Sequence, residues 1–150
     1  LIRRQRQMCI RDSYQGLAQA QASMEIRGSV LALSSGNSTV DSLCFVLASV
    51  LRDESVDMTA PTSNVTVINY MDDDVHEENL TWTKELLGAE RGDADMLEAD
   101  EHMLITVTLP DTVSLGAYDT FILQVVPPKG ATITLKRTLP GCIKTVTNLN

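Results

Sequence analysis

Apolar and polar side chains alternate along most of this chain from Met24 onward, with a period close to that of a strand rather than a helix. The clearest segment is 131–138, in which Ala131, Ile133 and Leu135 alternate with threonine and lysine. Because successive side chains of a strand point to opposite faces, this pattern predicts a half-buried strand. Other strands are predicted at 43–51, 64–70, 80–86, 103–109 and 121–125. A further strand, made mostly of small residues, is predicted after residue 26. The segment 43–51 is so continuously apolar that we expect it to be covered on both faces.

Turn-forming residues separate these segments. Glycine, proline, asparagine and aspartate gather at 35–37, 60–61, 72–74, 88–95, 110–111, 127–130 and 140–141. Seven short strands joined by polar turns, without a helix between each pair, predict an all-β antiparallel sandwich. A length of 150 residues with 43% hydrophobic content suits one such domain.

The charge of the chain is acidic and unevenly distributed. Twelve lysines and arginines stand against 20 aspartates and glutamates, for a net charge of -8. Residues 1–27 carry five arginines and two carboxylates, or +3, so the remaining residues carry -11. This balance and an aromatic content of 4% argue against a nucleic-acid partner. The longest apolar run, Leu43–Ala48, predicts no membrane span in the chain as given, since a membrane helix needs about 20 residues.

The first 25 residues are predicted to be a separate piece from a domain at 26–150. Residues 14–25 suggest a short helix remnant, and nothing in the segment has the pattern of a signal peptide. Residues 4–13 also resemble translated sequencing-adapter sequence, in which case residues 1–13 are not native and the natural N-terminus is missing. The alternative is a disordered basic tail.

The residues that usually carry catalysis are few. His76 and His102 are the only histidines, and we expect both to be solvated surface residues. Cys9, Cys44 and Cys142 lack the spacing of a zinc or redox site, and no phosphate-binding loop or nucleophile motif occurs. We therefore expect no enzyme and no cofactor. Cys44 is expected in the core, with a bridge to Cys142 as the alternative in an oxidising compartment.

Three N-glycosylation sequons begin at Asn37, Asn64 and Asn79, each in or beside a predicted turn. Three in a chain of this size favour an exported glycoprotein carrying an N-glycan. The alternative is that asparagine and threonine are simply frequent here.

Two acidic clusters differ in what they predict. Residues 72–78 are expected to be a solvated charged loop. The segment 92–101 instead spaces its oxygen ligands as calcium loops do, without the glycine and closing glutamate of an EF-hand. We expect a structural Ca²⁺ or Mg²⁺ there, held by Asp93, Asp95, Glu98 and Glu101.

Three parts of the sequence together resemble the archaellins, the archaeal flagellins, over about residues 14–150. The proline-rich turn and threonine-rich strand at 127–140 are similar to that family's ending. The segment Leu80–Lys84, the acidic loop at 93–101 and Ile105–Val107 look like its aromatic strand, loop and following strand. Residues 26–60 look like the first strands of its outer domain.

The resemblance implies an immunoglobulin-like sandwich that coats the archaellum filament. It implies a structural subunit that polymerises with its own copies or other subunits outside the cell for motility, and whose family is N-glycosylated. The sequence departs from the family at its long apolar helix, of which only residues 14–25 could be the tail. The alternatives are an immunoglobulin-like cell-surface adhesin or carbohydrate-binding module, and a hydrolase that uses the acidic loop.

Overall fold

The computed structural model describes residues 23–36, 38–59, 65–90 and 92–150. They form eleven strands: β1 (Met24–Leu33), β2 (Ser42–Ser49), β3 (Val56–Asp57), β4 (Val67–Met71), β5 (His76–Glu77), β6 (Trp82–Leu87), β7 (Met96–Leu97), β8 (His102–Thr108), β9 (Thr120–Val126), β10 (Ile133–Thr138) and β11 (Val146–Asn148). Each of the seven predicted strands corresponds to one of the longer elements. The fold class is confirmed. Residues 14–22 of the predicted helix remnant lie outside the described residues. Its last two residues, Met24 and Glu25, are strand instead, because β1 begins two residues before the predicted domain boundary at residue 26.

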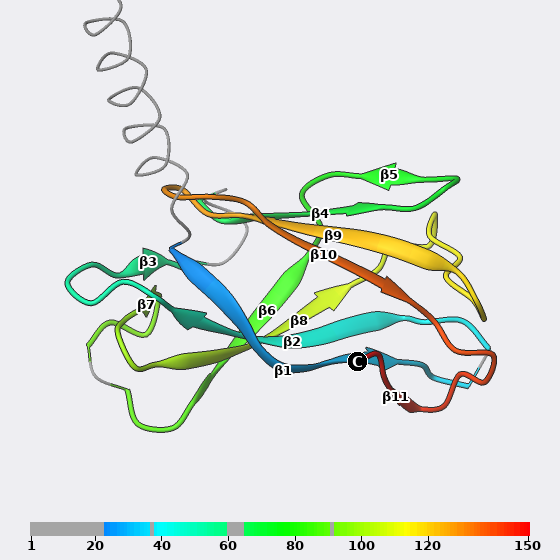
Figure 1. The fold of residues 1–150 in the computed structure, drawn as a ribbon, viewed down its shortest axis with the longest axis horizontal. Coiled ribbons are helices and arrows are strands. Elements are labelled where there is room, and N and C mark those ends of the chain that lie inside the picture. Colours follow the sequence, from blue (N-terminus) through cyan, green and yellow to red (C-terminus); the bar gives the residue numbers. More distant parts are fainter. Residues whose placement is uncertain (1–22, 37, 60–64, 91) are drawn as a thin grey trace, which may run out of the picture.

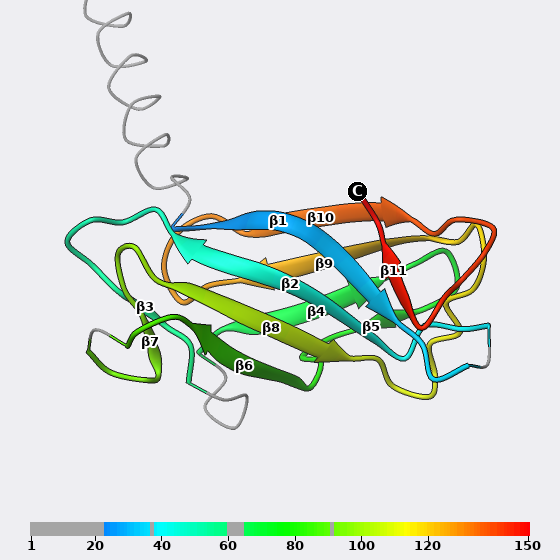
Figure 2. The ribbon, with the colours of Figure 1, turned by 90° about the horizontal axis from the view of Figure 1, so that it is seen from below.

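Two antiparallel sheets face each other as the layers of the sandwich (Figures 1 and 2). The five-stranded sheet has the order β11-β1-β2-β8-β6, and the four-stranded sheet has the order β10-β9-β4-β5. A small ribbon of β3 and β7 lies beside them. Neighbours in a sheet are often distant in the chain, as β2 and β8 are, so much of the fold depends on long-range pairing.

The core lies between the sheets and follows the alternation of the sequence. In β9, Phe121, Leu123 and Val125 are fully buried, whereas the residues between them are partly exposed. On the opposite sheet Phe45 and Ile105 are buried in the same way. Burial of a large aliphatic or aromatic side chain contributes about 1.5–3 kcal/mol. Because this contribution recurs at every second position, it fixes which face of each strand turns inward.

The strand β2 is buried on both faces, as its sequence predicted. Leu43, Cys44 and Phe45 are all buried in succession, although only Leu43 and Phe45 point into the core between the sheets. Cys44 lies on the outer face between Leu31 of β1 and Thr106 of β8. Its neighbours on both sides shield the small side chain from solvent.

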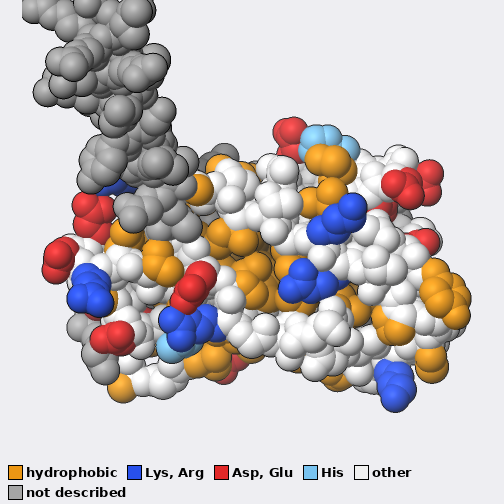
Figure 3. All heavy atoms as spheres, in the orientation of Figure 1, with side chains coloured by type: hydrophobic (Ala, Val, Ile, Leu, Met, Phe, Trp, Pro, Cys, Tyr) orange, Lys and Arg blue, Asp and Glu red, His pale blue; other side chains and the backbone are white. Residues whose placement is uncertain are grey.

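The strand β1 contains an irregularity that simple alternation does not predict. Its pairing with β2 shifts between Arg27 and Leu31, where Gly28 has a φ of 73°. Glycine adopts this left-handed backbone without the steric cost that a side chain would add. The resulting bulge bends β1 where it runs near β10, and apolar side chains remain visible between these two strands (Figure 3).

Within the described residues, no helix is both long and apolar enough to cross a membrane.

Candidate functional site

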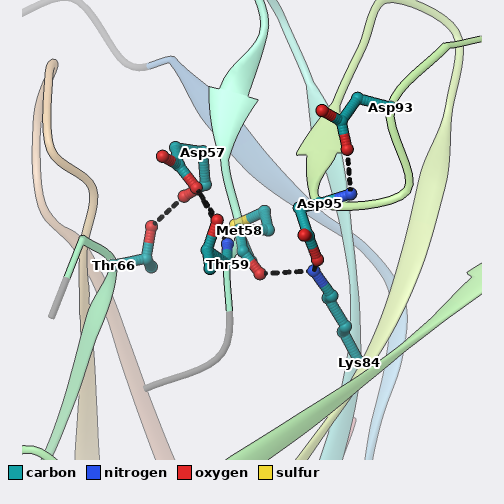
Figure 4. A network of polar contacts seen from close by, with 7 residues as sticks. All are labelled: Asp57, Met58, Thr59, Thr66, Lys84, Asp93 and Asp95. Carbon is teal, nitrogen blue, oxygen red and sulfur yellow. Dashed lines mark hydrogen bonds and ion pairs between the residues drawn. The ribbon is translucent and has the colours of Figure 1, made fainter. Parts of the chain in front are cut away.

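The four predicted metal ligands lie in the connection between β6 and β8, which contains β7 and packs against β3. Figure 4 shows two of them, Asp93 and Asp95. Pairing of Val56 with Leu97 and of Asp57 with Met96 joins the two short strands. The ribbon is anchored from beneath, because Val56 and Leu97 are buried in the core. The acidic segment is therefore an ordered surface structure held on the sandwich.

Lys84 connects this ribbon to the five-stranded sheet. Its ammonium group forms an ion pair with Asp95 and donates a 2.8 Å hydrogen bond to the carbonyl oxygen of Met58. The backbone N–H of Met58 donates in turn to the carbonyl oxygen of Asp95, at 2.8 Å. The ammonium thus lies between β3 and the β7 segment, where it is bound by one carboxylate and one carbonyl.

A second set of hydrogen bonds completes this network on the β3 side. The Asp57 carboxylate accepts hydrogen bonds from the backbone N–H and the hydroxyl of Thr59, at 2.9 and 2.5 Å. These bonds, helped by the positive charge of Lys84, lower the pKa of Asp57 despite a small opposing effect of burial. The buried Thr66 hydroxyl donates to the carbonyl oxygen of Asp57 at 2.7 Å. The network joins four separate parts of the chain.

The structure does not bring the four predicted ligands together. Asp93 accepts a 3.0 Å bond from the backbone N–H of Asp95, which is itself paired with Lys84. The Glu98 carboxylate lies over Gly92, and the buried Glu101 accepts a 3.0 Å bond from the Glu98 N–H. Among the described residues no three histidine, cysteine, aspartate or glutamate side chains are placed to hold a metal ion. The cation that the structure places beside Asp95 is the ammonium of Lys84, and the metal site stays a prediction from sequence.

Replacing Lys84 by methionine is expected to lower the free energy of unfolding by about 1–2 kcal/mol, because it removes a charged hydrogen bond and an ion pair. The matched control is Lys129→Met. Lys129 also pairs with a carboxylate, that of Glu54, but its side chain is 80% exposed against 19% for Lys84. Exposed pairs contribute little, so the control should change stability by under about 0.5 kcal/mol. Urea denaturation measures both, and equal losses would contradict the role given to Lys84.

The other acidic segment connects β4 to β5 and is organised around a buried tyrosine. Tyr70 is fully buried, stacks against Phe121 with ring centroids 6.2 Å apart, and donates a 2.7 Å hydrogen bond to Asp72. Burial alone would raise the pKa of Asp72, but bonds from Tyr70 and from the backbone N–H groups of Asp74 and Val75 outweigh it and lower that pKa. Asp72 is therefore a structural part of the turn, whereas Asp73 and Asp74 are exposed, as predicted for a solvated loop.

Stability should fall in alkali because of Tyr70. Burial, together with the hydrogen bond to Asp72 and the charges of Asp72 and Asp119, raises the pKa of Tyr70 in the folded chain. The unfolded chain keeps the ordinary value near 10, so its tyrosine ionises first. The stabilisation is complete below about pH 10 and is lost as the pH rises further.

Tyr70→Phe is the variant that isolates this effect. It should cost about 1 kcal/mol at neutral pH through the lost hydrogen bond, and its stability should fall less steeply above about pH 10 than that of the unchanged chain. Urea denaturation at a series of pH values between neutrality and alkali measures the difference. If the free energy of unfolding fell equally steeply with pH in both proteins, Tyr70 would not be the cause of the loss of stability in alkali.

The remaining predicted residues are spread over the surface and core. Asn79 is exposed in the turn after β5, and its backbone N–H donates to the Asn69 side chain at 2.9 Å. Asn37 and Asn64 lie outside the described residues. His76 is exposed and lies 3.8 Å from Glu78, while His102 is partly exposed at the start of β8.

The described cysteines are both free thiols. Cys44 is buried and lies 3.3 Å from the Thr106 hydroxyl, whereas Cys142 is exposed. Cys44 is buried as predicted, but on the outer face of β2 rather than in the core between the sheets. The alternative disulfide between Cys44 and Cys142 is not formed in the structure.

Comparison with known proteins identifies the fold. No protein-family model and no curated protein sequence matches the chain. Among solved structures, the archaeal flagellum of Methanospirillum hungatei strain JF1 aligns with a TM-score of 0.65 and 19% identity, over 96% of this chain and 80% of that one. Archaeal flagellin FlaB1 from Methanocaldococcus jannaschii aligns with a TM-score of 0.69 and 10% identity, over 84% of this chain and 95% of that one.

A third solved structure is similar over less of this chain. The archaellum periplasmic stator protein complex FlaF and FlaG from Sulfolobus acidocaldarius aligns with a TM-score of 0.51 and 13% identity, over 77% of this chain and 88% of that one. At these low sequence identities, the structural similarity establishes the fold of this chain but not its activity. The chain has an archaellin-like β-sandwich fold.

Proposed function

We propose that this chain is a structural subunit of the archaellum filament, in which its sandwich forms part of the outer wall. One observation carries the proposal. The sandwich aligns with two archaeal flagellins at TM-scores of 0.65 and 0.69, over at least four fifths of each chain. The stator complex, whose TM-score is 0.51, is the less similar relative. The segments that resemble archaellins include β10, which pairs along its full length with β9 in one sheet.

The surface chemistry supports a location in the external medium. The chain after residue 27 carries -11, since residues 1–27 hold +3 of the net -8. Most of this charge lies on exposed turns and strand ends, where like charges on neighbouring filaments repel and oppose non-specific association. Exposure of Asn79 supports an N-glycan there, with the sequons at Asn37 and Asn64 as further acceptors. The role is non-catalytic, and the partners are copies of the chain or other filament subunits.

Fractionation of cells that carry the gene tests this proposal. Filaments sheared from the cells and purified should contain peptides from residues 23–150, and the cell envelope should be depleted of them relative to the filament fraction. Peptides confined to the envelope would contradict a filament role and would favour a stator-like protein or a surface adhesin. The intact mass of the chain in the same material tests whether it carries N-glycans. A mass equal to that of the unmodified chain would contradict glycosylation without affecting the filament assignment.

A further inference from the structure

The outer face of the five-stranded sheet is uncovered, although its middle carries apolar side chains where a sheet that faces water is usually polar. Figure 2 shows this sheet in front of the other, with no element of the described residues lying across β2 or β8. Of the eight residues that these two strands turn outward, half are apolar and none is lysine, arginine, aspartate or glutamate. The apolar ones are Cys44, Val46, Ala48 and Leu104, and the polar ones are Ser42, His102, Thr106 and Thr108.

This apolar surface continues onto the neighbouring strands. Leu31 and Leu33 of β1 lie on the same face and are partly exposed, because they pair with outward-facing residues of β2. Val146 of β11 and Leu87 of β6 extend the surface at two of its borders, where they are 52% and 43% exposed. We call the surface formed by all these residues the outer sheet face. Contiguous exposed apolar surface of this kind marks a contact site.

One row across the outer sheet face carries opposite charges at its two ends. The row begins at Arg27 of β1, which pairs with Val46 of β2. Val46 pairs with Leu104 of β8, and Leu104 pairs with Glu85 of β6. We call these four residues the charged row. It is cationic at one end, apolar over its middle and anionic at the other end.

Both ends of the charged row have room for a partner. Glu85 is exposed, and no residue of the described chain forms a hydrogen bond or ion pair with its carboxylate. Arg27 is also exposed and binds Glu25 through Nε and Nη2, which leaves Nη1 available for a second carboxylate. Three strand spacings, or roughly 14 Å, separate the two ends of the row, so Arg27 and Glu85 of one copy do not pair with each other.

We propose that the outer sheet face binds the outer sheet face of a second copy of this chain, with a two-fold axis along the strands between β2 and β8. This axis exchanges the ends of the charged row, so Arg27 of each copy lies over Glu85 of the other. Val46 of each copy then lies over Leu104 of the other. Stacked sheets lie about 10 Å apart and cross at about 30°, which displaces the ends of the row by only about 4 Å, within the reach of an arginine.

The size of the outer sheet face agrees with a contact of this kind. The paired stretches 42–48 and 102–108 are roughly 23 Å long, and the four strands from β1 to β6 span roughly 19 Å. The flat projection of the face is therefore roughly 440 Å² per copy, and two copies bury at least about 900 Å². The exposed side chains of Leu87 and Val146 increase this area toward the roughly 1,000 Å² at which specific contacts begin.

The contact differs in kind from those that build a filament. A two-fold contact uses the same surface on both copies, so it closes as a dimer and does not propagate. The dimer therefore forms between free copies of the chain, and the inference goes beyond the proposed filament role without depending on it.

Charge exchange in the full chain tests the contact. Glu85→Arg places two cations over each other at both ends of the charged row, and Arg27→Glu places two carboxylates there. Each single variant should dimerise at least about tenfold more weakly than the unchanged chain, because two attractions become two repulsions. The double variant Arg27→Glu/Glu85→Arg exchanges the ends of the row and should dimerise within about threefold of the unchanged chain. Sedimentation equilibrium at about 0.15 M salt measures all four proteins.

Matched controls separate the charged row from a general effect of net charge. Asp73→Arg and Lys136→Glu change the net charge by the same amounts, at exposed positions that belong to the four-stranded sheet and its turn. Both should dimerise as the unchanged chain does. All four substituted positions are exposed, and the circular dichroism spectrum verifies that each variant is folded.

The apolar middle of the outer sheet face has a variant of its own. Leu104→Lys places an ammonium group among apolar side chains of both copies and should weaken dimerisation at least about tenfold. Its matched control is Ile122→Lys, because Ile122 is partly exposed in the middle of β9, on the outer face of the other sheet. The control should dimerise as the unchanged chain does.

Each outcome bears on the contact alone. A chain that stays monomeric over the whole concentration range, or single variants that dimerise as it does, would overturn the contact. A double variant no stronger than the single ones would overturn the two-fold arrangement, and equal losses in the controls would place the contact elsewhere. None of these results bears on whether peptides of the chain occur in sheared filaments.

Discussion

Replacing Leu123 by alanine is expected to lower the free energy of unfolding by about 3–4 kcal/mol, which is a large part of the roughly 5–15 kcal/mol available to a domain. Leu123 is fully buried in the middle of β9, between Tyr70 of β4 and Leu135 of β10. The shorter side chain leaves a cavity that neighbouring strands cannot close without losing their pairing. Urea denaturation followed by tryptophan fluorescence measures the loss, since Trp82 is also buried in the core.

The matched control for this prediction is Leu87→Ala. Leu87 ends β6 and is 43% exposed, so the same chemical change removes much less buried surface. We expect a loss of under about 1 kcal/mol. A cost at Leu87 equal to that at Leu123 would mean that the core is not centred between the two sheets.

A charge placed on the inner face of β8 should prevent folding. Ile105 is fully buried and pairs with Phe45 on one side and with Lys84 on the other. Ile105→Asp would bury a carboxylate among apolar core residues. The neighbouring Lys84 lies on the same face, but its ammonium is already bound by Asp95 and the Met58 carbonyl oxygen, so we expect a cost of several kcal/mol beyond the lost apolar burial. The expected result is an unfolded chain at 25 °C, seen as a collapsed proton NMR dispersion.

Thr108→Asp provides the comparison in the same strand. Thr108 is exposed on the opposite face of β8, so its aspartate stays in water and should change stability by about 0.5 kcal/mol or less. A folded Ile105→Asp variant together with an unfolded Thr108→Asp variant would show that the faces of β8 are reversed. That result would overturn the alternation on which the fold assignment depends.

The longer strands could be predicted because alternation is a local signal. In β9 every second residue is buried and faces the same side, and Ile133 and Leu135 repeat the pattern in β10, so period alone identifies the strand and its inner face. The short strands β3, β5 and β7 could not be found in this way. Two residues carry no period, and their pairing depends on which distant segments the sandwich brings together.

The acidic loop shows what local reasoning about a site leaves out. Ligand spacing between residues 92 and 101 predicts a metal ion, which stays a prediction, but it does not reveal that Asp95 pairs with Lys84, eleven positions away on another strand. One sequence signal could have found it. Between Arg52 and Lys129 the only lysine or arginine residues are Lys84 and Arg91, so Lys84 had few competitors for a carboxylate of that region.

Immunogold electron microscopy tests the central claim most directly. Antibodies raised against residues 23–150 would be applied to unpermeabilised motile cells that carry the gene, with cells lacking the gene as the control. If the sandwich forms part of the filament wall, gold particles should lie along the filaments and disappear in the control cells. Gold confined to the cell envelope, beside unlabelled filaments, would contradict the claim that this chain is a filament subunit.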